Sequence, residues 1–241
     1  MYRSKKILSY VFGGLAVLYG ILLLFPQILF SNTLNHENFI VYYHSEKVDS
    51  DQLTSILNQS LNLLKNSDLF ESKKKQKIFL CDGFGEFAFF ALRSRKSFAV
   101  NYPLVQNVFI SKSNILENTI ERNGAENNIR TLSGVIAHET THSILEDRLG
   151  FLKYKLLPSW KNEGYCDYVA QESSYDEKLG WNQICRNKDN VISSSYTYFK
   201  YKTYVEHLLN EEKRTISDFL AQDFDLENLA IKSRKKYCLE P

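Results

Sequence analysis

The chain has 241 residues, of which 44% are hydrophobic and 24% are charged. This balance is that of an ordinary folded protein, and it excludes the disordered, collagen-like and miniprotein classes. The net charge is +2, and Arg3, Lys5 and Lys6 supply three of the 30 basic residues, so the rest of the chain carries 27 basic against 28 acidic residues. Such a near-neutral domain lacks the concentrated basic face that nucleic-acid binding requires, and we expect no nucleic-acid partner.

An uncharged, apolar segment of 24 residues runs from Ile7 to Phe30. As a helix it would be about 36 Å long, against roughly 30 Å for the hydrocarbon core of a bilayer. The sequence therefore predicts an uncleaved transmembrane signal anchor over residues 7–30. A cleaved signal peptide and a buried core helix are the alternatives, but Ser31 and Thr33 form only a weak cleavage site.

Positive charge flanks this segment on its N-terminal side only. By the positive-inside rule, residues 1–6 form a cytoplasmic tip, and residues 31–241 form one exported domain, periplasmic or extracellular. Cys166 is equally compatible with core packing and with a disulfide. An oxidising compartment would permit disulfides in three possible pairings among the four cysteines of the exported part, Cys81, Cys166, Cys185 and Cys238.

The exported part is expected to be α+β, with a small, mainly antiparallel sheet followed by a helical part. After Asp49 and Ser50, both good helix caps, apolar residues recur at helical spacing and predict an amphipathic helix. The segment between residues 81 and 107 is rich in aromatic residues and gives no clear assignment. Strands are expected at residues 39–43, 77–81 and 107–111, and further helices at residues 131–149, 158–171, 196–209 and after Thr215.

Residues 138–142 read His-Glu-Thr-Thr-His, an HExxH pattern. On a helix, His138 and His142 stand one turn apart on the same face, so two imidazoles could hold one Zn²⁺ at about 2.0 to 2.1 Å. Glu139 is adjacent to that face, where its carboxylate would reach a water and act as the catalytic general base. The competing interpretation is a helix that carries two hydrogen-bonded histidines and no metal.

A third ligand is expected downstream, since catalytic zinc usually has three protein ligands and one open position. Twenty residues separate His142 from Glu163, enough to end the first helix and bring a second helix alongside. Glu163 then completes a His-His-Glu set, and Gly164 lets the two helices approach closely. Asp167, four residues further on, would accept the other ring N–H of a zinc-bound histidine and fix its tautomer.

The HExxH pattern followed by an Asn-Glu-Gly-aromatic segment resembles the gluzincin metallopeptidases, which include thermolysin and the aminopeptidase N type enzymes. Residues 157–165, Leu-Pro-Ser-Trp-Lys-Asn-Glu-Gly-Tyr, are especially similar to the Trp-x-Asn-Glu-Gly-aromatic signature of the latter and to small peptidase-MA-like domains. The clear likeness covers residues 131–171. It implies that zinc is bound by His138, His142 and Glu163, that Glu139 is the base and that Asp167 supports a ligand.

Two features depart from the aminopeptidase N pattern. The gap before Glu163 is longer, and the sequence has no Gly-x-Met-Glu-Asn segment to bind a free amino terminus. We therefore expect an endopeptidase rather than an aminopeptidase. The family also supplies a Tyr or His that stabilises the oxyanion, and Tyr198 and Tyr201 are the leading candidates.

The expected chemistry is hydrolysis of a peptide bond by a zinc-bound water, with Glu139 accepting a proton and later delivering it to the leaving amine. A peptide or protein substrate would lie as an added strand along a sheet edge. Residues 107–111 are the candidate edge, although an internal strand fits them equally well. A catalytically inactive zinc-binding envelope module is the main alternative, and an anchored structural protein without metal is a third.

Overall fold

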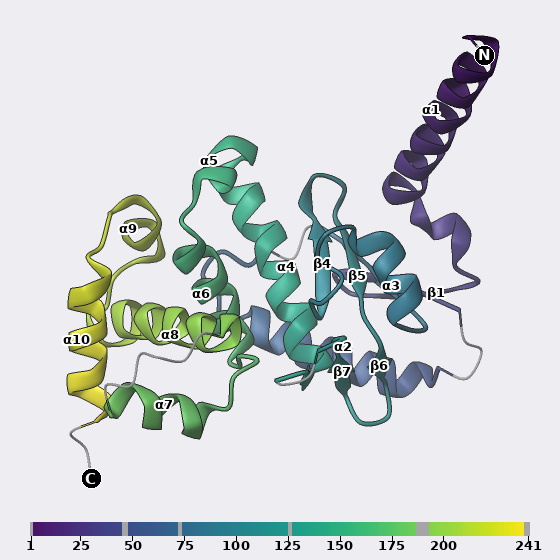
Figure 1. Ribbon diagram of the computed structural model, residues 1–241. Helices are drawn as coiled ribbons and strands as arrows, with labels where there is room; N and C mark the ends of the chain where they lie inside the picture. Colours follow the sequence, from purple (N-terminus) through teal and green to yellow (C-terminus); the bar gives the residue numbers. More distant parts are fainter. Residues whose placement is uncertain (1, 45–47, 72–73, 125–126, 187–192, 239–241) are drawn as a thin grey trace.

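The computed structural model of the protein describes residues 2–44, 48–71, 74–124, 127–186 and 193–238. The described strands all lie in the N-terminal half of the body, together with two α-helices, and the C-terminal half is helical (Figure 1). The α+β prediction is therefore confirmed, with a small sheet followed by a helical part.

The larger sheet has five strands, β1 (Asn32–His36), β2 (Phe39–Tyr43), β3 (Gln76–Leu80), β4 (Ala99–Tyr102) and β5 (Asn107–Ile110). Their order across the sheet is β1-β2-β3-β5-β4. The outer pairs, β1 with β2 and β4 with β5, are antiparallel, whereas the inner pairs, β2 with β3 and β3 with β5, are parallel. The sheet is mixed, so the prediction of a mainly antiparallel sheet is wrong for its centre.

The parallel pairs follow from the helices between their strands. Helix α2 (Ser50–Leu64) connects β2 to β3, and α3 (Phe84–Ala91) lies between β3 and the β4–β5 pair along the chain. Parallel neighbours need such crossover connections, whereas antiparallel ones need only a short turn. The cap of α2 is as predicted, because the Asp49 carboxylate accepts the backbone N–H groups of Asp51 and Gln52 at 2.9 and 3.1 Å.

The candidate substrate edge at residues 107–111 is an internal strand. β5 lies between β3 and β4, and its residues are all buried. The edge strand next to β5 is β4. It belongs to the aromatic-rich segment for which the sequence predicted no secondary structure. A strand that is buried on both faces has a largely apolar sequence. Such a sequence does not show which other strand pairs with it in the sheet.

A second sheet leads into the helical part. It has three antiparallel strands, β6 (Ser113–Asn114), β7 (Thr119–Glu121) and β8 (Ile129–Thr131). β8 runs directly into α4 (Leu132–Leu149), the helix that carries the HExxH pattern. The N-terminus of α4 is thereby fixed to a sheet.

The helices predicted from sequence periodicity are present. Gly164 was predicted to let the HExxH helix and the Glu163 helix approach closely, but it faces a different helix. A Cβ at this position would lie 2.7 Å from the backbone oxygen of Tyr201, in the helix Ser194–Glu206. The helical part consists of α4, α5 (Phe151–Leu156), α6 (Ser159–Ala170), α7 (Glu177–Cys185), α8 (Ser194–Glu206) with a π-helical turn (His207–Glu211), α9 (Ile216–Ala221) and α10 (Leu226–Tyr237).

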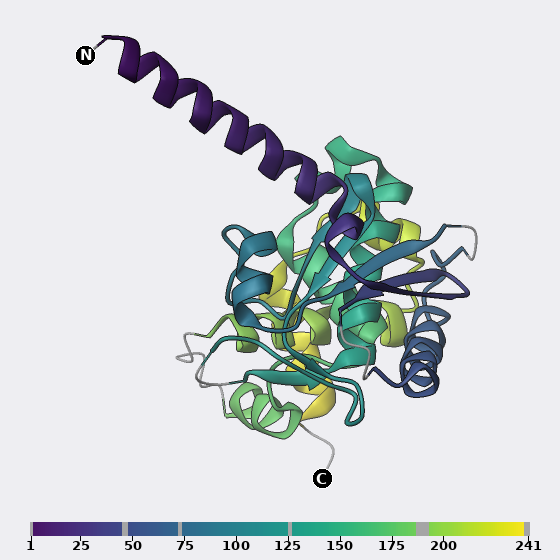
Figure 2. The same cartoon turned by 90° about the vertical axis from the view of Figure 1, so that its right-hand side faces the viewer.

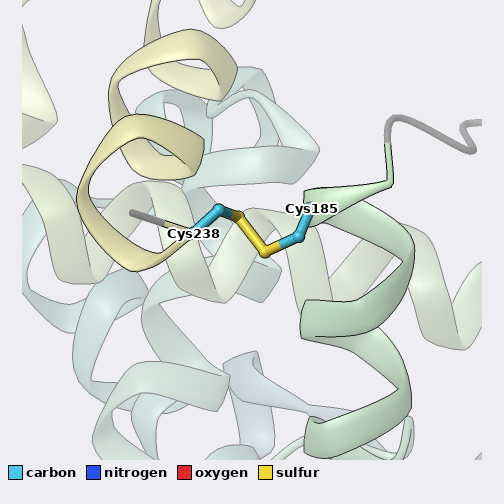
Figure 3. Close-up of a disulfide and its surroundings, with 2 residues drawn as sticks. All are labelled: Cys185 and Cys238. Atoms are coloured by element: carbon cyan, nitrogen blue, oxygen red, sulfur yellow. A yellow bond between two sulfur atoms is a disulfide. The ribbon is translucent and has the colours of Figure 1, made fainter. Parts of the chain in front are cut away.

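A disulfide joins the C-terminal ends of two of these helices. Cys185 at the end of α7 is bonded to Cys238, which follows α10 (Figure 3). Cys81 and Cys166 are free and buried. Of the two alternatives for Cys166, the structure therefore supports core packing.

Helix α1 (Tyr2–Leu24) extends away from the body and is followed by the short 3-10 helix η1 (Pro26–Leu29) (Figure 1, Figure 2). Many of its apolar side chains from Tyr10 onwards are exposed. Within the described part of the chain, no helix meets the length and apolarity needed to cross a membrane. The transmembrane helix predicted over residues 7–30 thus has no support from the structure.

Candidate metal centre

Helices α4 and α6 lie against each other in opposite directions and bring the predicted residues together. The N-terminus of α4 is capped by Thr131, whose Oγ1 accepts the backbone N–H of Gly134 at 3.0 Å. His138 and His142 are buried on the face of α4 that meets α6, and their ring centroids lie 4.9 Å apart.

Both histidines turn Nε2 towards one carboxylate of α6. Oε2 of Glu163 lies 3.5 Å from Nε2 of His138 and 3.9 Å from Nε2 of His142. Ligand atoms that each lie about 2.0 to 2.1 Å from one tetrahedral zinc ion are separated from one another by about 3.3 Å. The separation from His138 is close to this value and the one from His142 is longer, so a small movement of the His142 ring would let the two histidines and Glu163 hold one zinc ion.

The Nδ1 atoms of the two rings are held from the opposite side. Nδ1 of His138 lies 2.8 Å from Oδ1 of Asp167, the partner predicted from the sequence. Nδ1 of His142 lies 3.0 Å from Oδ1 of Asn162 and 3.3 Å from the hydroxyl oxygen of Tyr154 on α5. Because Nδ1 is engaged in each ring, Nε2 is the nitrogen that remains directed at Glu163.

A buried arginine links this pair of helices to the second sheet. Arg130 on β8 places Nη2 3.1 Å from Oδ1 of Asp167 and Nε 2.9 Å from Oε1 of Glu172, just beyond α6. Glu172 also accepts the hydroxyl of Thr131 at 2.8 Å. Charge-assisted hydrogen bonds thus connect the start of α4 to the end of α6. They hold Asp167 in contact with the ring of His138.

The charges of this cluster shift the pKa values of its members. Burial disfavours the charged form of His138, but the negative charge of Asp167 and its hydrogen bond outweigh burial, and the pKa of His138 is raised to about 10. Burial also disfavours the charged form of Glu163, but the two histidines outweigh it, and the pKa of this carboxyl is lowered to about 2. The shifts describe a protonated His138 paired with an ionised Glu163, and a zinc ion bound here would take the place of the proton on His138.

Glu139 lies beside the ligands and lines the same cavity. Its side chain is buried, and burial raises the pKa of the carboxyl, although the neighbouring histidines oppose this effect. Asn101 on the edge strand β4 donates from Nδ2 to the backbone oxygen of Glu139 and to Oγ of Ser143. The sheet edge therefore holds the helix turn that carries the proposed base.

Cys166 offers an alternative third donor. One donor atom from each of His138, His142 and Cys166 lies within 4.8 Å of the others. The thiol sulfur, however, approaches His142 at Nδ1, at 3.3 Å, on the side that faces Asn162. Burial raises the pKa of this thiol well above its usual value, whereas zinc requires a thiolate. Glu163 therefore fits the third position better than Cys166.

The site opens into a cavity of about 330 Å³. Tyr198 on α8 lines this cavity beside the proposed ligands, and burial raises the pKa of its hydroxyl to about 12. Tyr201 is not among the residues that line the cavity, in the part of the chain that the structure describes. Of the two candidate tyrosines, only Tyr198 is placed to contact a substrate.

Sequence reasoning missed several residues that support the site. Arg130 and Asn101 both come from strands: only the tertiary fold brings Asn101 to α4, and Arg130, two residues before α4, to Asp167 of α6. Asn162 stands inside the motif that resembles the gluzincins, so its nearness to Glu163 was a usable signal, and Tyr154 follows the HExxH helix by one short turn.

Comparison with protein-family models gave no match, and comparison with curated proteins gave none either.

Proposed function

We propose that the chain is a zinc-dependent peptidase, with His138, His142 and Glu163 as the zinc ligands. The observation that carries the proposal is the convergence of two imidazole Nε2 atoms on one carboxylate oxygen, at 3.5 and 3.9 Å, at the wall of a cavity. A buried glutamate follows the first histidine in the same cavity, which is the arrangement that hydrolysis requires and that simple metal binding does not.

Zinc, when bound, supplies the Lewis acidity that polarises a scissile carbonyl and favours deprotonation of water. Glu139 accepts the proton of the attacking water and passes it to the leaving amine. Its buried setting suits this role, because a raised pKa makes the carboxylate a stronger base towards the attacking water. Tyr198 donates a hydrogen bond to the oxygen on which negative charge develops.

The substrate is expected to be a peptide that adds to the edge strand β4. Ala99, Val100 and Asn101 of this strand line the cavity that contains Glu139. Backbone pairing with a sheet edge recognises peptides of many sequences, and it presents an internal peptide bond to the site. This supports an endopeptidase rather than an aminopeptidase.

We also propose that the catalytic domain lies outside the cytoplasm, attached through residues 7–30 to a membrane. The disulfide between Cys185 and Cys238 supports this location, since such bonds persist in oxidising compartments. The exposed apolar side chains of α1 are of the kind that a bilayer would cover.

The test is cleavage of a mixed peptide library by the wild type and by Glu139→Gln, with half of the peptides blocked at the amino terminus. The substitution keeps the shape of the side chain and all three ligands, so zinc content should be unchanged while hydrolysis falls by about 10²- to 10⁴-fold. Glu146→Gln, on the same helix but away from the cavity, is the matched control and should retain activity.

Other outcomes would change the proposal. Equal activity of Glu139→Gln and the wild type would remove Glu139 as the base. Cleavage confined to free amino termini would indicate an aminopeptidase. Zinc-loaded wild type that cleaves no peptide would favour the inactive binding module.

A further inference from the structure

The C-terminal end of α1 is fixed to the body of the protein. Nδ2 of Asn107, at the start of β5, donates to the backbone oxygens of Leu23 and Leu24 at 3.0 and 3.4 Å. After the single turn of η1, Phe30 is buried and stacks on the ring of His44. No long linker therefore separates α1 from the domain, and whatever surrounds α1 lies close to the body.

Exposed apolar side chains extend from this attachment point towards α5. Leu104, in the 3-10 helix η2 (Pro103–Val105), lies three residues before Asn107, and it lines the same surface hollow as Phe151 of α5. In both views α5 and the end of α1 lie towards the top of the body, with β4 and β5 between them in Figure 1 (Figure 1, Figure 2). We call the following six exposed residues the base surface: Ile28, Leu29, Leu104, Phe151, Leu152 and Leu156.

Helix α5 is the most exposed part of the base surface. Its residues Leu152 and Leu156 are 75% and 82% exposed, which is unusual for leucine in a folded body. On the opposite face of the same helix, Tyr154 is buried and contacts His142. The helix is therefore held by its inner face, and the exposure of its outer leucines is a feature of the folded protein.

Basic residues accompany these apolar ones. Lys153 and Lys155 alternate with the exposed leucines of α5, and Lys74 and Lys75 line the hollow between Leu104 and Phe151. Glu146 and Asp147 also line the hollow, but Asp147 pairs with Lys74. Apolar side chains next to lysines are the composition of surfaces that rest in the headgroup region of an anionic bilayer.

We propose that the base surface rests on an anionic lipid bilayer, so that the body lies directly on the membrane surface. The inference depends on the membrane location proposed above and is independent of the peptidase activity. A bilayer matches the observations better than a second protein copy, because the apolar α1 leaves the body at this point and its neighbouring surface would meet the lipid headgroups. Lys75, Lys153 and Lys155 would then face lipid phosphates while Leu152 and Leu156 enter the interface.

The experiment places an environment-sensitive fluorophore on the full chain in bilayer nanodiscs, either phosphatidylcholine alone or phosphatidylcholine with phosphatidylglycerol. Leu152→Cys is the test position. Leu116→Cys, in the turn between β6 and β7 away from the end where α1 joins the body, is the matched control, because Leu116 is 74% exposed (Figure 1). Labelling should be selective, since Cys81 and Cys166 are buried and the other two native cysteines are in the disulfide.

We expect blue-shifted emission at position 152 in the anionic bilayer and unshifted emission at position 116. The shift should decrease in phosphatidylcholine alone and in the Lys153→Gln/Lys155→Gln background. Equal emission at the two positions in a chain that is anchored in the nanodisc would overturn the inference. A shift at position 152 that grows with the number of chains per disc and not with lipid charge would instead indicate contact between copies, and would also overturn it.

Failure of the chain to associate with nanodiscs would overturn the membrane location together with this inference. Peptide hydrolysis by the same preparation would still be measurable, so this result is distinguishable from failure of the proposed peptidase function.

Discussion

Nδ1 of His138 lies 2.8 Å from Oδ1 of Asp167 in the buried layer between α4 and α6. The same carboxylate oxygen is 3.1 Å from Nη2 of Arg130. Asp167 therefore has two roles: it balances the charge of the buried Arg130, and it orients the imidazole ring of His138. Because the ring is fixed through Nδ1, its Nε2 stays directed at Glu163 without any contribution from a metal.

Asp167→Asn should weaken zinc binding while preserving the fold. The amide has the shape of the carboxylate but not its charge, and loss of a group that orients a ligand typically costs about 10- to 100-fold in metal affinity. Arg130 keeps Glu172 as a charged partner. Zinc dissociation constants measured by competition with a chelator check the prediction. Asp147→Asn, at an exposed position of α4, is the control, and equal affinity of the two variants would show that Asp167 does not support the metal.

Glu163 and Cys166 can be separated by substitution. Glu163→Gln should lose more zinc affinity than Asp167→Asn, because it removes a ligand rather than a supporting group. Cys166→Ala should retain one zinc per chain, since the thiol lies on the Nδ1 side of His142. Elemental analysis of both proteins after reconstitution decides between the two donor sets. Retention of zinc by Glu163→Gln and its loss from Cys166→Ala would establish the His-His-Cys set instead.

Tyr198 and Tyr201 are three residues apart on α8, but only Tyr198 lines the cavity. Tyr198→Phe should lower kcat by roughly 10²- to 10³-fold with little change in KM, as expected for loss of one hydrogen bond to the developing oxyanion. Tyr201→Phe is the control and should retain near wild-type kcat. Steady-state kinetics on one blocked peptide measures both. A KM effect alone would assign Tyr198 to substrate binding.

Local patterns predicted the part of the site that lies on the helices. The spacing of His138 and His142 fixes one helix face, and the segment around Glu163 is long enough to form a helix that returns alongside the first. Gly164 correctly indicated a close helix contact but not its partner, since a Cβ there would lie 2.7 Å from the Tyr201 oxygen of α8 and not against α4. These inferences depend only on short-range geometry, which sequence spacing describes well.

Sheet order was not predictable in the same way. β5 is more apolar than β4, so the sequence favours it as a strand, but the pairing of β4 outside β5 depends on contacts that only the folded chain makes. The approach of Asn101 to α4 and of Arg130 to Asp167 on α6 has the same origin. Neighbours across a fold are set by tertiary packing, and neither propensity nor periodicity describes it.

The disulfide between Cys185 and Cys238 should stabilise the C-terminal helices. The two cysteines are 53 residues apart, and closing a loop of this length restricts the unfolded chain, so removal of the bond should cost roughly 2 to 5 kcal/mol. Thermal unfolding of the wild type with and without reductant measures the effect, and Cys185→Ala/Cys238→Ala should unfold at the temperature of the reduced wild type. Reductant should leave the double variant unchanged, because Cys81 and Cys166 are free thiols already. An equal shift by reductant in both proteins would show that the stabilising bond is a different one.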